Sequence, residues 1–381
     1  MSLQRSTEQT LLHDAATRWV AEAEGLDRAA RRRAIAGFGW LAILVPEADG
    51  GLGQGLADAC ALAEALGAAA GADPWLPVAV QAAGLLAACT DPARRARWLP
   101  PLAEGASLLV PATLERGGRD RARPDVVRAV RVAGGWRLDG EVRVLPAGGE
   151  ADAWLVGALG ADGAACFVVP RGAAGVRATA VDAVDGGLAC RLGFDGARVP
   201  DDAWLPGVDA RASARVDDRA LVVASAESVG SIDALLRDTV AYLRTRVQFG
   251  RPLAANQALR HRVADLAIGA EEARSATLAA IIALEDAARA GDDRAHARAA
   301  AGVRAKVGAV ARRVAEEAIQ LHGGMGVTDE LRVSRHLKRQ LALDAMLGPP
   351  EWHLRRHATL RPPAAGGARS RPSRTAEEAA R

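Results

Sequence analysis

The spacing of hydrophobic positions divides the chain into three regions. Over residues 11–109, Ala, Leu and Val recur every three or four positions, which is typical of amphipathic helices. Over residues 110–205, short runs rich in β-branched residues alternate with Gly and Pro, which predicts a small β-domain. From residue 210 to about 360 the helical spacing returns in longer segments. The pattern therefore predicts helices, then strands, then long helices.

The breaks in this pattern place the predicted elements. The β-type runs cover residues 126–132, 136–138, 153–156 and 166–169. Three long helices are predicted over residues 217–245, 253–289 and 294–321, with Gly291 and Gly323 suited to C-terminal caps. Such helices usually form an antiparallel bundle. We therefore predict a helical domain over 1–109, a β-domain over 110–209, a four-helix bundle over 210–360 and a disordered tail over 361–381.

Charge and composition exclude several classes of protein. The chain of 381 residues has a net charge of +3, and five Arg and two Glu in residues 361–381 account for all of it. The neutral body offers no basic face for nucleic acid. No long apolar run or signal segment occurs, so we expect no membrane insertion and a cytoplasmic location. Four widely spaced cysteines are expected to be buried free thiols.

Two short motifs carry the chemistry. Residues 244–252 read RTRVQFGRP and are followed by Gln257, and residues 320–326 read QLHGGMG. Together they resemble the flavin-binding signature of the acyl-CoA dehydrogenase family. The segments GWL at 39–41, VPE at 45–47, GGLG at 50–53 and EALG at 64–67 extend the resemblance along the chain. It implies the acyl-CoA dehydrogenase fold, an α+β multidomain architecture, and FAD as the cofactor.

The resemblance also implies which residues hold the cofactor. In the family, residues at these positions contact the adenine dinucleotide from the neighbouring subunit; here they are Arg246, Gln248, Phe249, Gln257, Gln320, Gly323 and Gly324. Arginine offers planar donors for a pyrophosphate, and glycine lets backbone N–H groups approach it. The alternative is that Arg246 is a helix C-terminal cation and Phe249 an ordinary core residue.

The catalytic base is the weak point of the resemblance. Dehydrogenation of an acyl thioester needs a carboxylate to remove the α-proton, and the family's usual glutamate position corresponds to Leu347. A second position used by some relatives corresponds to Ala220. Glu227 lies two turns, about 10 Å, beyond Ala220 and is the first substitute to consider, although a structural role is the simpler interpretation. Asp344 and Glu351 flank the vacant position.

The side of the site that faces the flavin ring also departs from the family pattern. The family's usual Thr-Glu-Pro segment with a following Gly-Ser-Asp corresponds to residues 112–120. Its second segment, commonly Trp-Ile-Thr, corresponds to residues 144–146, and a third contact, a threonine, corresponds to Pro349. The four histidines at positions 322, 336, 353 and 357 do not repeat as metal ligands, so no metal is expected.

Two functions remain open. The first is an FAD-dependent acyl-CoA dehydrogenase of an atypical, small-subunit-like branch, which introduces an α,β-double bond with a displaced base. The second is a catalytically silent subunit that completes the flavin site of a paralogue in a heterotetramer. In both, the resemblance implies an acyl-CoA substrate and an electron-transfer flavoprotein as acceptor.

Overall fold

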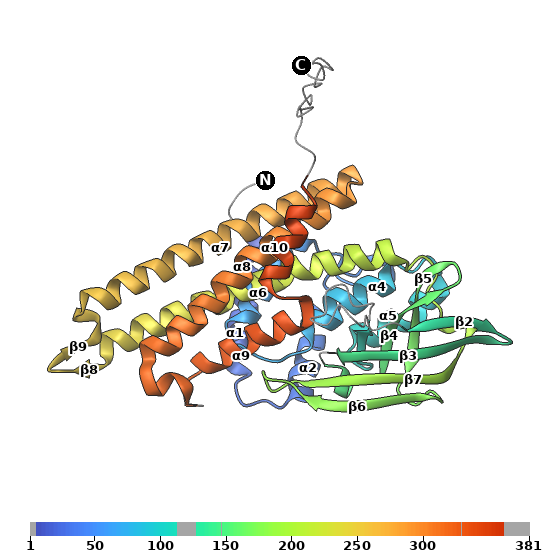
Figure 1. The fold of residues 1–381 in the computed structure, drawn as a ribbon, viewed down its shortest axis with the longest axis horizontal. Coiled ribbons are helices and arrows are strands. Elements are labelled where there is room, and N and C mark those ends of the chain that lie inside the picture. The colour runs from blue at the N-terminus through green and yellow to red at the C-terminus, as the bar shows by residue number, and fades with distance from the viewer. Residues whose placement is uncertain (1–4, 113–126, 146, 329, 362–381) are drawn as a thin grey trace, which may run out of the picture.

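The computed structural model describes residues 5–112, 127–145, 147–328 and 330–361. Helices come first, a seven-stranded sheet follows, and long helices end the chain (Figure 1). This is the order that the hydrophobic pattern predicts. The predicted ring-side segment 113–120, Pro146 and the predicted disordered tail from 362 onward lie outside the described residues.

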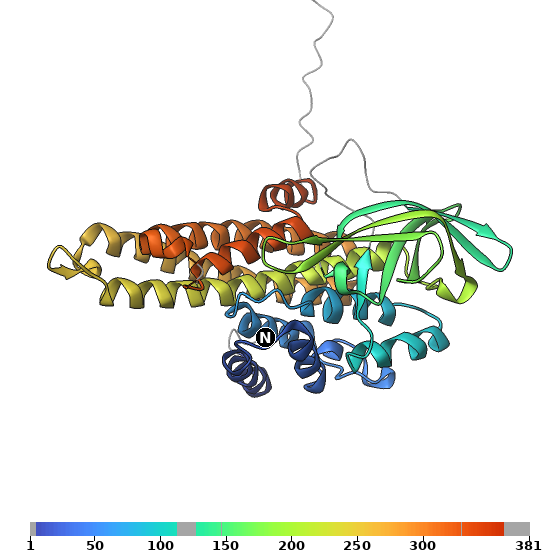
Figure 2. The same ribbon diagram turned by 90° about the horizontal axis from the view of Figure 1, so that it is seen from below.

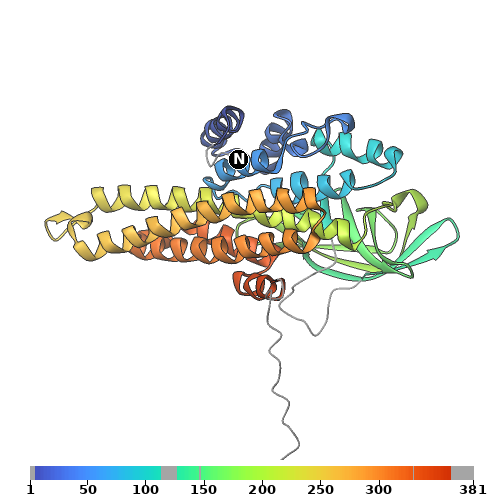
Figure 3. The ribbon, with the colours of Figure 1, turned by 90° about the horizontal axis from the view of Figure 1, so that it is seen from above.

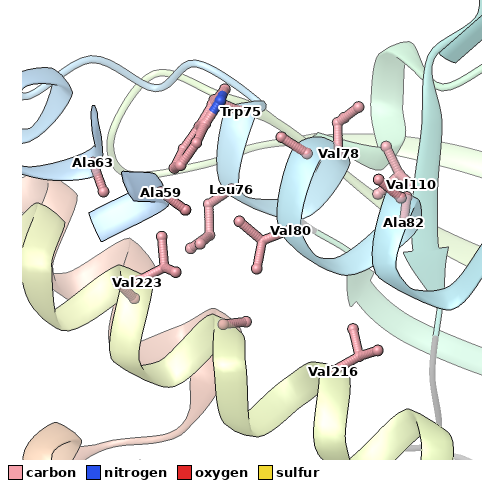
Figure 4. Close-up of a cluster of buried hydrophobic side chains, with 14 of the residues drawn as sticks. Ala59, Ala63, Trp75, Leu76, Val78, Val80, Ala82, Val110, Val216 and Val223 are labelled. Carbon is pink, nitrogen blue, oxygen red and sulfur yellow. The ribbon is translucent and has the colours of Figure 1, made fainter. Parts of the chain in front are cut away.

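The N-terminal part is a helical layer with one irregular helix at its centre. Its α-helices are α1 (Thr7–Glu22), α2 (Arg28–Gly37), α3 (Leu56–Gly67), α4 (Ala83–Ala87) and α5 (Pro92–Ala103). Short 3-10 turns occupy Trp40–Ala42 and Glu47–Asp49, and a π-helix, η3, spans Leu76–Ala82. All seven residues of η3 are buried, because it lies between the other N-terminal helices and the bundle (Figure 4).

A mixed sheet forms the middle of the chain. Its strands are β1 (Leu109–Ala112), β2 (Arg128–Val132), β3 (Gly135–Leu145), β4 (Ala153–Gly160), β5 (Gly163–Pro170), β6 (Val176–Asp182) and β7 (Leu188–Pro200). The order is β1-β4-β2-β3-β7-β6, with β5 paired to β4. The four predicted β-runs correspond to β2, β3, β4 and β5, whereas β1, β6 and β7 were not among them. The turn between β6 and β7 contains Asp185, which accepts a hydrogen bond from Arg339.

The C-terminal helices are longer than the pattern predicts at one end and shorter at another. They are α6 (Ala210–Thr245), α7 (Gln257–Ala290), α8 (Asp293–His322), α9 (Val333–Leu347) and α10 (Pro350–Thr359). α6 begins seven residues before the predicted 217, because the Asp209 side chain caps it by accepting a hydrogen bond from Ala212 N–H. α7 begins after the predicted 253, because a 3-10 turn occupies Leu253–Ala255. Gly291 (φ 68°) ends α7 as predicted.

The parts are arranged along the axis of the bundle. The N-terminal helices cover one flank of α6, and α10 lies on the opposite side (Figures 2 and 3). The sheet lies at one end, and a small hairpin of β8 (Val247–Gln248) and β9 (Arg251–Pro252) projects from the other (Figure 1). The sheet and the hairpin therefore lie at opposite ends of the bundle.

Close contact between α3 and α6 fixes the N-terminal layer on the bundle. A Cβ added to Gly67 would lie 1.9 Å from the Glu227 carbonyl oxygen, and one added to Gly230 would lie 1.8 Å from that of Glu64. Only glycine allows two helix backbones to approach this closely. The contact holds the middle of α6, where Glu227 lies, in one register.

The structure also decides two smaller predictions. All four cysteines are free and buried, as predicted. Burial raises the pKa of the Cys166 thiol to about 12, so it is not a reactive thiolate at neutral pH. Along the described part of the chain, none of the helices has the length and apolar character needed to cross a bilayer.

Candidate functional site

The predicted cofactor residues lie together at the hairpin end of the bundle. Arg246, Gln248 and Phe249 belong to the hairpin that joins α6 to α7, and Gln257 is the first residue of α7. Gln320 is in the last turn of α8, and Gly323 and Gly324 follow it. All seven residues are exposed. We call this region, residues 244–257 with 320–324, the motif end.

The hairpin holds its side chains outward in a strained turn. Phe249 (φ 53°) and Gly250 (φ 76°) both have left-handed backbone, and the Phe249 side chain is 99% exposed. A large residue in this conformation costs roughly 1–2 kcal/mol. It is therefore not the core residue that the alternative interpretation required. Strain and full exposure at the tip indicate a contact outside this chain.

Charge and open space at the motif end fit the dinucleotide half of FAD. Within the described residues, neither Arg244 nor Arg246 has a carboxylate partner. No atom lies within 4 Å of where a Cβ would stand on Gly323 or Gly324, so the space beside both is open, although the left-handed backbone of Gly323 (φ 61°) itself favours glycine. Unpaired arginines beside open backbone can hold a pyrophosphate.

The two positions that the family resemblance assigns to the base hold apolar side chains. Leu347 is the last residue of α9, is half-buried and packs against the core. Ala220 is fully buried. Val223, one turn beyond Ala220, points towards Leu76 of η3 (Figure 4), and Val216, one turn before Ala220, lies against Gly84 of α4. Neither position can accept a proton.

Glu227 is buried and already paired. Arg339 of α9 donates from Nε to Glu227 Oε1 at 2.7 Å and from Nη2 to Oε2 at 3.4 Å. The same guanidinium donates from Nη1 to Asp185 Oδ2 at 2.9 Å. Burial by itself lowers the pKa of Arg339, but attraction to Glu227 and Asp185 outweighs it and raises that pKa above its usual value. A carboxylate held in this way is a poor general base, because its lone pairs are occupied.

The two carboxylates that flank Leu347 are no better placed. Asp344 accepts a hydrogen bond at 2.6 Å from Arg304, whose side chain is completely buried. Burial raises the pKa of Asp344, although Arg304 opposes this. Glu351 is exposed in the first turn of α10, where water competes for its proton. We call Asp185, Glu227, Arg304, Arg339 and Asp344 the buried charge cluster.

Only a weak sequence signal pointed to this cluster. Arg339 and Arg304 were not among the predicted site residues. In α9 the buried positions 333, 336, 340 and 343 follow helical spacing, and two of them are His336 and Gln340. Polar residues on a buried stripe imply that polar partners lie inside the bundle. Arg339, next to Gln340 in α9, is one of the buried polar residues.

The histidines make contacts within the protein. His336 Nδ1 lies 2.7 Å from Ser231 Oγ, and burial lowers the pKa of His336 to about 4. His353 Nε2 donates to the Leu347 carbonyl oxygen at 2.7 Å, and burial lowers its pKa to about 4 as well. His357 donates to the Arg298 carbonyl oxygen. Among the described residues, no group of three His, Cys, Asp or Glu has metal-site geometry.

Comparison with known proteins identifies the family. The model of the acyl-CoA dehydrogenase N-terminal domain matches residues 3–106, and that of the C-terminal domain matches residues 215–359. Acyl-CoA dehydrogenase FadE27 of Mycobacterium tuberculosis is 32% identical over 328 residues, which are 85% of this chain and 86% of that protein. The chain belongs to the acyl-CoA dehydrogenase family. It is thus assigned to the flavoprotein oxidoreductases that act on acyl-CoA in lipid metabolism.

Two solved structures of this family are similar over nearly the whole chain. A chain of the ChsE4–ChsE5 complex from Mycobacterium tuberculosis matches with a TM-score of 0.84 and 27% identity, covering 96% of this chain and 100% of that one. A variant of the Tcur3481–Tcur3483 steroid ACAD matches with a TM-score of 0.80 and 29% identity, covering 93% and 97%. The acyl-CoA dehydrogenase fold predicted from the two motifs is confirmed.

Proposed function

We propose that this chain is one subunit of a hetero-oligomeric acyl-CoA dehydrogenase, in which it completes the FAD site of a paralogous partner. The partner supplies the catalytic base. One observation carries the proposal: in the described part of the chain, each acidic residue considered as a base is either ion-paired inside the bundle or exposed. The two family base positions are Leu347 and Ala220.

The motif end supports the cofactor part of the proposal. When bound, FAD supplies the hydride acceptor for α,β-dehydrogenation of an acyl thioester. Arg246 would neutralise the pyrophosphate, Phe249 would contact the adenosine part, and Gln320 with the backbone of Gly323 and Gly324 would hydrogen-bond the dinucleotide. All of these groups face outward, so they suit a cofactor carried largely by another subunit.

The opposite, ring-holding side offers less. Pro349, where the family usually has threonine, lacks both a hydroxyl group and a backbone N–H. This asymmetry supports a chain that contributes to a partner's flavin more than to its own. The similar structures ChsE4–ChsE5 and Tcur3481–Tcur3483 are each named for two different chains, which supports a hetero-oligomer with a paralogue.

The alternative is a dehydrogenase that uses its own displaced base. It is favoured by the position of Glu227 on α6, two turns from a known base position and buried from water. It requires Glu227 to leave Arg339 when substrate binds. We further propose an electron-transfer flavoprotein as electron acceptor and a cytoplasmic location, which the four free thiols fit.

The visible spectrum of the purified protein tests the proposal. Expressed alone, the chain is expected to be colourless; co-expressed with its paralogue, it should purify as a yellow complex that acyl-CoA bleaches. Replacing the partner's base glutamate by Gln should abolish bleaching of the complex, whereas Glu227→Gln in this chain should not. A chain that binds flavin alone, and whose flavin is bleached by acyl-CoA until Glu227→Gln is introduced, would establish the alternative.

A further inference from the structure

A pair of aromatic rings joins the two separate segments of the motif end. The ring of Tyr242, in the last turn of α6, stacks on the imidazole of His322 at the end of α8, with centroids 4.4 Å apart and planes at 29°. The Tyr242 hydroxyl group also donates to the His322 carbonyl oxygen at 3.3 Å. Residues 80 positions apart in sequence are thereby held together.

Each ring is connected directly to the residues that face outward. The backbone N–H of Arg246 donates to the Tyr242 carbonyl oxygen at 2.8 Å, which ends α6 and starts the hairpin. His322 immediately precedes Gly323 and is only 4% exposed. Its Nδ1–H donates to the Ala318 carbonyl oxygen at 2.8 Å, which fixes the plane of the imidazole. A shift of either ring therefore moves one motif segment relative to the other.

The ring stack lies where the core gives way to the exposed segments. Leu243 and Leu321, next to the two rings, are buried in the core and hold the ends of α6 and α8. Helix ends and exposed hairpins open most easily in a folded protein. An ion pair of Arg262 with Glu317 also joins α7 to α8, but its side chains are 38% and 36% exposed, and exposed ion pairs contribute little to stability. The half-buried ring stack thus links the start of the hairpin directly to the backbone that precedes Gly323.

We propose that Tyr242 and His322 act as a unit of positioning residues for the dinucleotide half of FAD. They do not touch the cofactor; they hold Arg246 and Gly323 at the spacing that one dinucleotide spans. The inference rests on the function proposed above. It adds a prediction that the cofactor contacts alone do not make: FAD affinity depends on a ring stack that neither Arg246 nor Gly323 takes part in.

The FAD dissociation constant of the assembly that binds FAD, alone or with its paralogue, measures this role. Tyr242→Ala and His322→Ala are each expected to weaken FAD binding by about tenfold or more. The double variant should be no weaker than the worse single variant, because the two rings act together. Tyr242→Phe and His322→Phe retain a stack and should restore affinity to within about threefold of the original.

A matched control separates positioning from general destabilisation. His296 lies on the same helix, is 2% exposed and pairs with Asp218, but it stands 26 residues, about 39 Å, from His322. His296→Ala should lower the melting temperature at least as much as Tyr242→Ala while leaving FAD affinity unchanged. Unchanged affinity in Tyr242→Ala, or an equal loss in His296→Ala, would overturn the inference. If the original protein binds no FAD in either assembly, the proposed function fails and the inference falls with it.

Discussion

The motif end and the buried charge cluster differ in whether their polar groups are exposed and in whether they are paired. At the motif end, Arg246 and Gln248 are exposed, and Arg246 has no carboxylate partner among the described residues. In the cluster, Arg304 and Arg339 are buried; Arg304 pairs with one carboxylate of another element and Arg339 with two. Exposed polar groups are hydrated and free to bind a ligand, whereas buried polar groups must be paired within the protein. The difference indicates that this chain keeps exposed groups suited to binding a cofactor, whereas the carboxylates in its interior are used for structure.

The cluster also connects parts that are distant in sequence. Arg339 on α9 reaches Glu227 on α6 and Asp185 in the turn between β6 and β7. A salt bridge of this kind gains little net energy, because removing charges from water offsets their attraction. It does penalise any arrangement in which one partner is missing. We therefore regard it as a device that specifies how the sheet sits on the bundle.

The largest expected effect follows from removing the shared partner of the cluster. Arg339→Met should destabilise the protein by about 3–5 kcal/mol, because it leaves two buried carboxylates unpaired. Chemical denaturation at fixed protein concentration measures this. Arg312→Met is the control: Arg312 pairs with Glu316 on the exposed face of α8, and its loss should cost at most about 0.5 kcal/mol. Equal losses in both variants would mean that the cluster is not structural.

Lowering the pH should reduce the stability of the protein through the protonation of buried His336. Burial lowers the pKa of His336 to about 4, below its value near 6.5 in the unfolded chain. The contribution of the neutral imidazole is complete above pH 6.5 and is lost as pH falls towards 4, by about 3 kcal/mol. Its neighbours are Ser231 and, more distantly, Arg332, Arg237 and Asp238. His336→Gln cannot titrate, so its melting temperature should fall less between pH 6.5 and pH 4. Parallel curves for the two proteins would refute this origin of the acid sensitivity.

A smaller effect is expected at Glu227, the first substitute considered for the base. Glu227→Gln keeps a hydrogen-bond acceptor for Arg339 but removes a charge, so it should cost about 1–3 kcal/mol of stability. The rate at which acyl-CoA bleaches the flavin of the complex should change by less than about twofold. Stopped-flow absorbance measures the rate and denaturation measures the stability. A large drop in rate with little loss of stability would reverse our assignment and make Glu227 the base.

The same contrast separates the features that can be predicted from local sequence from those that depend on tertiary packing. The helices of the bundle and the motif end follow from local signals: apolar spacing, glycine caps and two contiguous motifs. Strand β7 was missed because its apolar alternation is broken at Asp195 and Gly196, opposite a register shift in β3. No local signal marks Gly67 and Gly230 as packing positions, and only the contact of α3 with α6 explains them.

The partners of Glu227 could not be predicted for a similar reason. An ion pair between residues 112 positions apart depends on how α6 and α9 pack, which no local pattern encodes. The resemblance predicts that the usual base is absent. It did not reveal that Glu227, the first substitute considered, is bound to an arginine.

The smallest effect on stability should come from the tip of the hairpin, and it tests the comparison most sharply. Phe249 contributes almost nothing to the core, being 99% exposed, and its left-handed backbone is unfavourable for a large side chain. Asparagine adopts that conformation more readily. Phe249→Asn should therefore leave the free energy of unfolding unchanged or raise it by up to about 1 kcal/mol.

The same variant should weaken FAD binding or assembly with the partner, as measured by FAD fluorescence and by size-exclusion chromatography. Val247→Asn, a nearby exposed residue outside the predicted contact set, serves as the control and should change neither. A residue whose removal improves the isolated chain but impairs the complex is retained for the partner. If Phe249→Asn instead binds FAD and assembles normally, the motif end is not the surface that serves the partner's flavin.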